Sequence, residues 1–337
     1  MRAVVLQGGF GLDRVRLEER PDPTPGPGEV LLRMHTASLN YRDLSIARGE
    51  YDPNLKRALV LGSDGVGEVA ELGDGVTRFA VGERLCPLFT RGWYKGPPTR
   101  ETPRSSLGGP LDGTFAEYLS VPEDDLVRPP EHLSDPEAAT LGVAGVTAYR
   151  ALFEEATAGP GHSTLVIGTG GVSTYAIILA RSAGADVLAV SRHAAKLERT
   201  ETIGARRGID SSKRPDWGLA VRDVTDGRGV DSVVEIGGAG TLAQSLRAVR
   251  AGGTILLIGA VAAAEEAPSL VPVLMRNIRV QGVFVGPRVS FEALVKELER
   301  SRAKPVVDRV FPLADYRAAF DHLASGEAFG KVCLDLG

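Results

Sequence analysis

The stretch LVIGTGGVS, Leu165 to Ser173, constrains the fold of this chain more than any other part of the sequence. It has the pattern of a βαβ unit: an apolar strand ends at Gly168, Gly170 and Gly171 form a tight turn, and a helix and a second apolar strand follow. In such a unit the first glycine permits the turn, and the second lets the backbone approach a pyrophosphate at the positive end of the helix dipole. The third glycine usually serves helix packing, so the small residue Ser173 is an acceptable replacement.

The pattern therefore predicts a dinucleotide site, although a tight turn that binds no ligand has the same local sequence. Strand, turn, helix and second strand all occur in register here, which favours the dinucleotide interpretation. The residues expected to contact the cofactor at this turn are Gly168, Thr169, Gly170, Gly171 and Val172.

The end of the second strand predicts which dinucleotide is bound. An acidic residue there would hold the ribose hydroxyls of NAD, but this strand ends at Ser191 and Arg192, with Lys196 one turn later. A hydroxyl and two cations suit the 2′-phosphate of NADPH, because charge-assisted hydrogen bonds to phosphate are strong. The alternative is that both cations are solvated residues at a helix start.

The remaining sequence divides into two parts of different character. The first ~120 residues contain short alternating stretches separated by Pro and Gly, which predicts a β-rich region. A helix start follows at Ser134, with Glu137 three residues on, and the segment continues with helical spacing to about residue 156. Strands and helices then alternate to about Val285, and their near-continuous apolar strands predict an α/β fold with a doubly wound parallel sheet.

Composition excludes several other classes of function. The net charge of -4 argues against nucleic-acid binding, and no apolar segment is long enough to cross a membrane. Cys86 and Cys333, each among apolar neighbours, are expected to be buried thiols in a reducing compartment. We therefore expect a cytoplasmic protein whose partner is a small molecule.

Several motifs together resemble the medium-chain dehydrogenase/reductase superfamily over essentially the whole chain. They are PGPGEVLLR, LGSDGVGEVAELGDGVTRFAVGERL, GVAGVTAYRAL, GTGGVS and FGKVCLDL. The resemblance implies a GroES-like β-rich catalytic domain formed by residues 1–144 and 287–337. It also implies an inserted Rossmann dinucleotide-binding domain, residues 145–286.

Zinc-dependent members of that family carry Cys, His and Cys ligands at positions that hold Asn40, Ser63 and Val143 here. None of the three is a normal zinc ligand. The chain is thus similar to the zinc-free NADPH:quinone oxidoreductases and enone reductases, and we expect no metal. It departs from them at Ser173, where they usually have glycine, and near Ser211, where many have a tyrosine beside the 2′-phosphate.

Without a metal, hydride transfer needs hydrogen-bond donors and an acceptor whose anion is already delocalised, which favours quinones and α,β-unsaturated carbonyls over saturated alcohols. The candidate catalytic donors are Asn40, Tyr41 and Tyr51, each of which could instead have a structural role. The resemblance adds Thr147 beside the nicotinamide. Four further residues are expected to contact the cofactor from the carboxyl ends of later strands: Ile258, Gly259, Val285 and Gly286.

The sequence thus predicts an NADPH-dependent reductase of quinones or activated alkenes. Two alternatives stay open: an alcohol or aldehyde dehydrogenase of the same fold, and a low-turnover NADP-binding sensor. From the resemblance and an apolar stretch, VQGVFVG at residues 280–286, we also expect a homodimer in which this stretch or its neighbour pairs across a two-fold axis.

Overall fold

The computed structural model describes residues 1–337 except 53, 56–57 and 260–266. The chain divides into two compact units. The first unit consists of Met1–Val146 and Gly286–Gly337, and the second unit is the continuous segment Thr147–Val285. These boundaries differ from the expected 144/145 and 286/287 by two residues and one residue.

The second unit contains a parallel sheet with the strand order β11-β10-β9-β12-β13-β14. This is the doubly wound order in which the chain reverses direction between its first and fourth strands, here β9 and β12. Ligands of such sheets bind at the carboxyl ends of the strands at that reversal. The strands are β9 (Ser163–Ile167), β10 (Asp186–Ser191), β11 (Arg207–Asp210), β12 (Val230–Glu235), β13 (Val249–Leu257) and β14 (Arg279–Gly282).

Helices alternate with these strands, and apolar residues of two of them, Trp217–Asp223 and Ala239–Ala248, pack with the strands into one core. The helices are α3 (Val146–Tyr149), α4 (Gly171–Ser182), α5 (Ala194–Thr202), α6 (Trp217–Asp223), α7 (Ala239–Ala248) and α8 (Val271–Met275). The strand β14 is shorter than the expected strand through residue 286. Val285 adopts a left-handed φ of 37° and Pro287 has no N–H, so neither fits a strand ladder.

A buried carboxylate joins the amino ends of β9 and β12. Asp231 accepts hydrogen bonds from the Ser163 amide (2.8 Å) and hydroxyl (2.7 Å) and from Arg250 Nε (2.6 Å). Burial raises the pKa of Asp231, but the Arg250 and Ser163 hydrogen bonds outweigh it, so the pKa lies below its usual range. The two strands are therefore fixed together at the end opposite the expected ligand site.

The first unit is built on a larger sheet with the order β15-β16-β3-β5-β6-β8, in which β7 also pairs with β3. A smaller sheet has the order β2-β1-β4. The strands are β1 (Arg2–Leu6), β2 (Val15–Glu19), β3 (Glu29–Leu39), β4 (Leu59–Val60), β5 (Gly65–Leu72), β6 (Arg84–Pro87), β7 (Tyr118–Pro122), β8 (Leu126–Val127), β15 (Val307–Pro312) and β16 (Lys331–Asp335).

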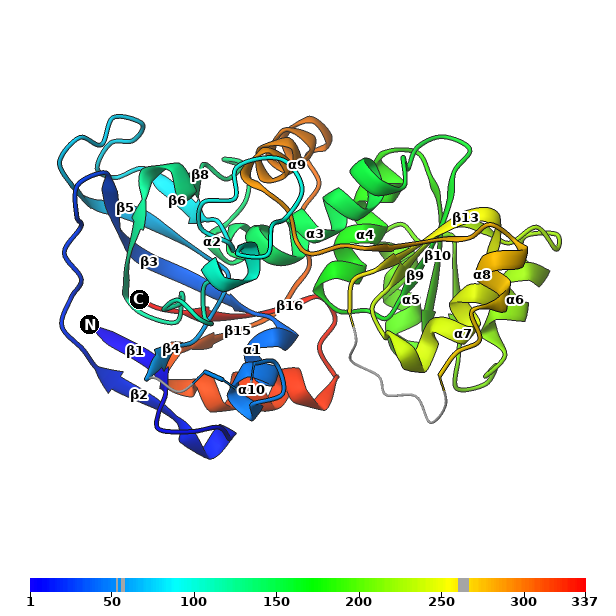
Figure 1. The fold of residues 1–337 in the computed structure, drawn as a ribbon, viewed down its shortest axis with the longest axis horizontal. Helices are drawn as coiled ribbons and strands as arrows, with labels where there is room; N and C mark the ends of the chain where they lie inside the picture. The colour runs from blue at the N-terminus through cyan, green and yellow to red at the C-terminus, as the bar shows by residue number, and fades with distance from the viewer. Residues whose placement is uncertain (53, 56–57, 260–266) are drawn as a thin grey trace. The chain divides into compact units, whose positions relative to one another are not determined.

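The two chain segments of the first unit meet where β16 pairs antiparallel with β3, from Val332 opposite Leu39 to Asp335 opposite Thr36 (Figure 1). The helices of this unit are α1 (Tyr41–Arg48), α2 (Asp135–Ala138), α9 (Arg288–Ser301) and α10 (Tyr316–Ser325), with short 3-10 turns at Leu12–Arg14, Thr102–Ser105, Glu123–Asp125 and Leu313–Asp315. One apolar core holds residues of both segments, from Val4 to Leu336.

The segment expected as one helix after Ser134 begins as expected but is interrupted. The capping box is present, since the Glu137 carboxylate accepts the Ser134 amide at 2.7 Å. Wide π-helical turns then occupy Leu141–Gly145 and Arg150–Glu155. The Gly142 amide donates to the Asp64 carboxylate (2.9 Å), which removes it from the helical ladder.

No helix in the described part of the chain has both the length and the apolar character needed to cross a bilayer. Both cysteines are free and buried, as expected.

Candidate functional site

The glycine turn lies at the carboxyl end of β9, at the reversal point of the parallel sheet. Gly168 has a φ of 78°, a left-handed conformation that favours glycine, and its amide donates to Val190 O (2.8 Å). Gly170 is the N-cap of α4, and a Cβ added to it would meet no atom within 4 Å. The first amides of α4 have no acceptor within the helix, so the turn presents backbone donors to open space. This cradle fits a pyrophosphate.

Ser173 occupies the position of the third glycine without disturbing the turn. It is fully buried, and its hydroxyl donates to Ile167 O at 2.9 Å. The helix therefore packs on β9 through a hydrogen bond rather than through close glycine contact. The departure at Ser173 thus has a structural explanation.

The residues expected to bind the 2′-phosphate lie at the carboxyl end of β10 and directly after it. Ser191 is buried and accepts a hydrogen bond from the His193 amide (3.2 Å). Arg192 is exposed, and no residue in the described part of the chain bonds its guanidinium. Lys196 lies half-buried in the first turn of α5. Asp186, by contrast, is at the opposite end of β10 and pairs with Arg206 (2.7 Å).

Sequence reasoning missed a buried carboxylate at the end of β12, beside the glycine turn in the sheet. Glu235 is fully buried and accepts the Gly237 (2.8 Å) and Gly238 (3.1 Å) amides at the start of α7. It also accepts the hydroxyls of Thr241 and Ser245. Its carboxylate fixes the loop after β12. The sequence signal that could have identified it is a glutamate at the end of a predicted strand, two residues before a pair of glycines.

The residues after β13 and β14 have different settings. Ile258 and Gly259 follow β13 directly, and a Cβ on Gly259 would lie 2.2 Å from Ile236 O, so glycine is required for the close approach of the two strand ends. Val285 ends the second unit, and Gly286 begins the second segment of the first unit. Thr147, the first residue of the second unit, is buried in α3.

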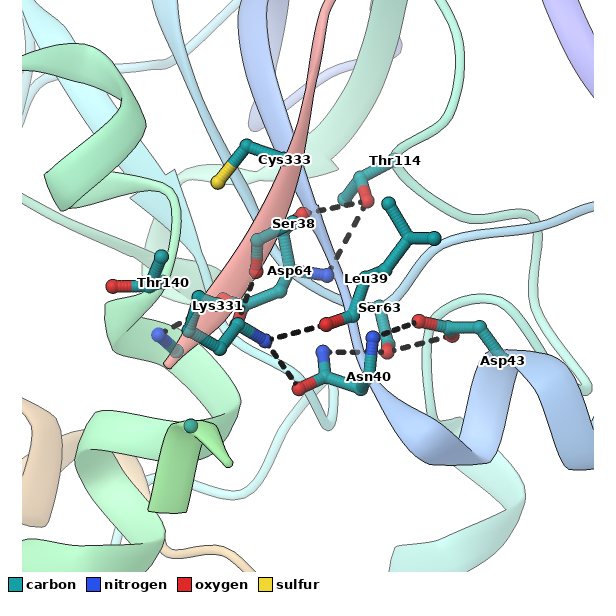
Figure 2. A network of polar contacts seen from close by, with 12 residues as sticks. Ser38, Leu39, Asn40, Asp43, Ser63, Asp64, Thr114, Thr140, Lys331 and Cys333 are labelled. Atoms are coloured by element: carbon teal, nitrogen blue, oxygen red, sulfur yellow. Dashed lines mark hydrogen bonds and ion pairs between the residues drawn. The ribbon is translucent and has the colours of Figure 1, made fainter. Parts of the chain in front are cut away.

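In the first unit, Asn40 belongs to a network of polar side chains around a buried lysine (Figure 2). The Lys331 ammonium, at the start of β16, donates to Leu39 O (2.8 Å) and Asn40 Oδ1 (2.6 Å). It also lies 3.7 Å from Asp64 Oδ2. Sequence reasoning did not single out Lys331 or Asp64. The sequence signal that could have identified Lys331 is a lysine followed directly by the apolar residues Val332, Cys333 and Leu334.

Ser63 links the amide of Asn40 to a second buried carboxylate. Asn40 Nδ2 donates to Ser63 Oγ (3.4 Å), and Ser63 Oγ donates to Asp43 Oδ1 (2.9 Å). The other Asp43 oxygen accepts a hydrogen bond from the backbone N–H of Asn40 (2.7 Å) and so caps α1. Burial raises the pKa of Asp43, and the nearby Arg42 guanidinium opposes that rise.

Burial is also the largest influence on the pKa values of the ion pair at the centre of the network, Asp64 and Lys331. It raises the pKa of Asp64 to about 6, while the Lys331 charge and the Ser38 hydroxyl act against that rise. It lowers the pKa of Lys331, which Asp64 opposes. Burial thus favours the neutral form of each group, whereas the 3.7 Å contact between them favours the ammonium and the carboxylate.

These side chains do not fit a zinc ion. Of the three positions that the resemblance aligns with zinc ligands, Asn40 and Ser63 are hydrogen-bonded to each other, and Val143 lies in the Leu141–Gly145 turn, whose Gly142 amide bonds Asp64 next to Ser63. Two of these positions carry neutral amide and hydroxyl groups and the third a hydrocarbon, whereas zinc takes Cys, His, Asp or Glu. The Lys331 ammonium would also repel a divalent cation. In the described residues, no group of three such ligands occurs anywhere.

The two candidate tyrosines are at opposite ends of α1. Tyr41 is its first residue and Tyr51 follows its C-cap; they are 43% and 47% exposed. The Tyr51 ring stacks on the Arg42 guanidinium, 4.9 Å from its centroid, and Phe89 lies 4.8 Å from the same group. The Tyr51 ring is therefore held by a cation–π contact, whereas both phenols remain accessible.

Two family models match the chain. Residues 26–131 match the alcohol dehydrogenase GroES-like domain, and residues 171–300 match the zinc-binding dehydrogenase model. The first match lies in the first unit and most of the second match lies in the second unit.

Known proteins resemble the chain over its full length. A zinc-type alcohol dehydrogenase-like protein of Schizosaccharomyces pombe is 39% identical, covering 100% of this chain and 99% of that protein. Acryloyl-coenzyme A reductase of Metallosphaera sedula is 30% identical, covering 99% of each. The crystal structure of an NAD-dependent alcohol dehydrogenase matches with a TM-score of 0.92 and 32% identity, covering 100% of both chains.

The open space around the Cβ position of Gly170 allows a test of pyrophosphate binding at the glycine turn. Gly170→Ala places a methyl group where a pyrophosphate would lie, so we expect dinucleotide affinity to fall at least about tenfold while the free energy of unfolding changes by about 1 kcal/mol or less. Gly159→Ala is the matched control, because Gly159 also has open space around its Cβ but lies in the loop before β9. Calorimetric titration with NADPH would measure both; equal affinity in the two variants would contradict the assignment.

Proposed function

Because the chain belongs to the medium-chain dehydrogenase/reductase superfamily, we propose that this oxidoreductase is a zinc-independent, NADPH-dependent reductase of quinones or α,β-unsaturated carbonyls. The observation that carries the proposal is the buried cluster at the zinc positions. Asn40 and Ser63 offer an amide and a hydroxyl there, and the Lys331 ammonium bonds the amide at 2.6 Å. Such a site can donate hydrogen bonds but cannot supply a Lewis acid.

The second unit would hold the cofactor, which supplies the hydride when bound. The amides at the start of α4 would donate to its pyrophosphate, with Gly170 leaving room for the close approach. Ser191, Arg192 and Lys196 would bond the 2′-phosphate at the end of β10. Arg192 is suited to this role because its guanidinium is exposed and unpaired within the described residues.

The first unit would stabilise the acceptor. Hydride addition to a conjugated carbon moves the π electrons to the carbonyl oxygen, and a hydrogen-bond donor stabilises the resulting delocalised anion. Asn40 Nδ2 is the donor we assign, because an amide nitrogen carries two N–H groups and Ser63 Oγ accepts from only one of them. The phenols of the exposed residues Tyr41 and Tyr51 are further hydrogen-bond donors. A proton from water completes the reduction.

The names of the relatives bear on which class of acceptor we propose. One relative is named for reduction of acryloyl-coenzyme A, which is an α,β-unsaturated carbonyl compound. Others are named alcohol dehydrogenases, which keeps an alcohol or aldehyde dehydrogenase as the second candidate. A saturated alkoxide has no delocalisation, so it would need a stronger electrostatic partner than an amide.

The first prediction concerns the acceptor. NADPH oxidation, followed by absorbance, is measured with a small quinone, a conjugated enone and a simple aldehyde, with and without a chelator. We expect turnover of the quinone or the enone at the same rate in both conditions, because the donor set does not fit zinc. Turnover confined to the aldehyde and abolished by the chelator would favour the alcohol dehydrogenase instead. A zinc-containing alcohol dehydrogenase assayed in parallel shows that the chelator is effective.

The second prediction concerns the cofactor. Arg192→Ala should weaken NADPH binding about tenfold or more, the scale of a lost charged hydrogen bond (~1.5–3 kcal/mol), and leave NADH binding nearly unchanged. Arg207→Ala is the matched control, since Arg207 is also exposed but lies at the amino end of β11. Fluorescence titration gives both affinities. Equal losses for the two cofactors would contradict a 2′-phosphate contact.

We also propose a homodimer formed by the second unit. Its edge strand β14 pairs only with β13 among the described strands. Exposed apolar side chains occur on α8, at its N-cap and at one position of β14: Leu270, Val271, Leu274 (76% exposed), Met275 and Val280 (39% exposed). A second copy pairing across a two-fold axis would cover both this patch and the unpaired edge.

Light scattering would test the dimer. We expect twice the chain mass at micromolar concentration and a shift toward monomer for Val280→Arg, which places a charge on the apolar edge. Val310→Arg is the matched control, because Val310 is 40% exposed on β15, the edge strand of the other sheet. A wild-type monomer would refute the proposal.

A further inference from the structure

The buried lysine of the first unit has no part in hydride transfer as described above. Lys331 is 3% exposed, and its ammonium contacts Leu39 O, Asn40 Oδ1 and the Asp64 carboxylate. Burying an ammonium costs several kcal/mol unless it is paired and hydrogen-bonded. A lysine at the buried start of a strand calls for a reason beyond packing.

The hydrogen bond from Lys331 to Asn40 determines how the side-chain amide of Asn40 is oriented. The oxygen of an asparagine amide only accepts hydrogen bonds and the nitrogen only donates them. An ammonium only donates, so Lys331 can bond Oδ1 but not Nδ2. The nitrogen is thereby directed to Ser63 Oγ, whose own proton goes to Asp43 (Figure 2). A rotation of the amide by 180° would place two donors against each other.

The ammonium also strengthens the amide as a donor. Its bond to Oδ1 draws electron density from the amide, and hydrogen bonds in such a chain reinforce one another in a medium of low dielectric. Asp64 keeps the ammonium in place, since one carboxylate oxygen is 3.7 Å away and the other accepts the Gly142 amide. Lys331 is buried whereas Asn40 is half-buried, so an acceptor can reach the amide but not the ammonium.

We propose that Lys331 is a positioning residue that holds the Asn40 amide with its N–H directed to the acceptor oxygen, in the place where related enzymes use a metal. This inference rests on the proposed function, because it assigns Asn40 as the donor to the developing anion. Lys331 itself contacts neither acceptor nor cofactor.

The test is a double-mutant cycle on the full chain with NADPH and the best acceptor of the panel. Lys331→Met removes the ammonium and should lower kcat about tenfold to a hundredfold, with the KM for NADPH within about twofold of wild type. Asn40→Ala should lower kcat by a similar factor, and the double variant should be no slower than the slower single variant. Lys331→Arg, which retains a donor-only cation, should recover part of the rate.

Lys304→Met is the control for replacing a lysine, since Lys304 lies in the same unit with its side chain 59% exposed. It should leave kcat unchanged. Effects of Lys331→Met and Asn40→Ala that multiply in the double variant, or a wild-type kcat in Lys331→Met, would overturn the proposal.

Asn40→Asp keeps the experiment decisive if Lys331→Met does not fold. The aspartate gives Lys331 a full ion-pair partner, so the melting temperature should not fall, but it has no N–H to donate. We expect kcat to fall at least about tenfold. A wild-type kcat in this variant would show that the amide N–H is not used and would overturn the positioning role.

A spectroscopic readout separates this proposal from the proposed function. The Asn40 side-chain ¹H–¹⁵N signals, identified by their loss in Asn40→Asp, should shift in Lys331→Met, or in Lys331→Arg if the former does not fold, and stay in place in Lys304→Met. If wild type reduces neither quinone nor enone, the proposed function fails, while a shift still supports the positioning role. Signals unmoved by the Lys331 variant would refute that role whatever the acceptor is.

Discussion

The first unit depends on one buried ion pair, between the Lys331 ammonium and the Asp64 carboxylate. Three parts of the chain meet there: the end of β3 with the start of α1, the π-helical turn Leu141–Gly145, and the first residue of β16. Removing one partner from such a pair leaves a buried charge without compensation, which typically costs about 3–5 kcal/mol. The geometry of the polar cluster around Asn40 is therefore coupled to the folding of the whole unit.

The two units build their candidate sites from different groups, the second unit from backbone and the first unit from side chains. The second unit relies on backbone: glycines at the carboxyl end of β9, the first amides of α4 and a sheet order that leaves this end open. Two buried carboxylates of this unit, Asp231 and Glu235, hold strand ends and a loop. The first unit relies on side chains, among them the Lys331 ammonium, the Asp64 carboxylate and the Asn40 amide. Backbone amides suit a phosphate-bearing cofactor that is the same in every turnover. Side chains vary between sequences, so they can suit different acceptors.

The local features of both units were predictable from sequence, and the long-range ones were not. The βαβ unit around the glycine turn and the capping box at Ser134 depend on residues close in sequence, so short-range patterns reveal them. Lys331 and Asn40 are 291 positions apart, and only the register of β16 against β3 brings them together. The interruption of the helix after Ser134 likewise depends on Asp64, 78 positions before Gly142. Spacing within one segment carries no information about such contacts.

The pairing of β16 with β3 has a consequence for synthesis of the protein on the ribosome. The second unit is continuous in sequence, so it can fold as soon as it has emerged. The polar cluster cannot form at that stage, because Asn40, Ser63 and Asp64 are synthesised before the second unit and Lys331 is synthesised after it. During that interval the edge of β3 that β16 covers has no partner, and Asp64 lacks its counter-charge. The nascent chain thus acquires its dinucleotide fold before its polar cluster, and a prematurely terminated chain would have the former without the latter.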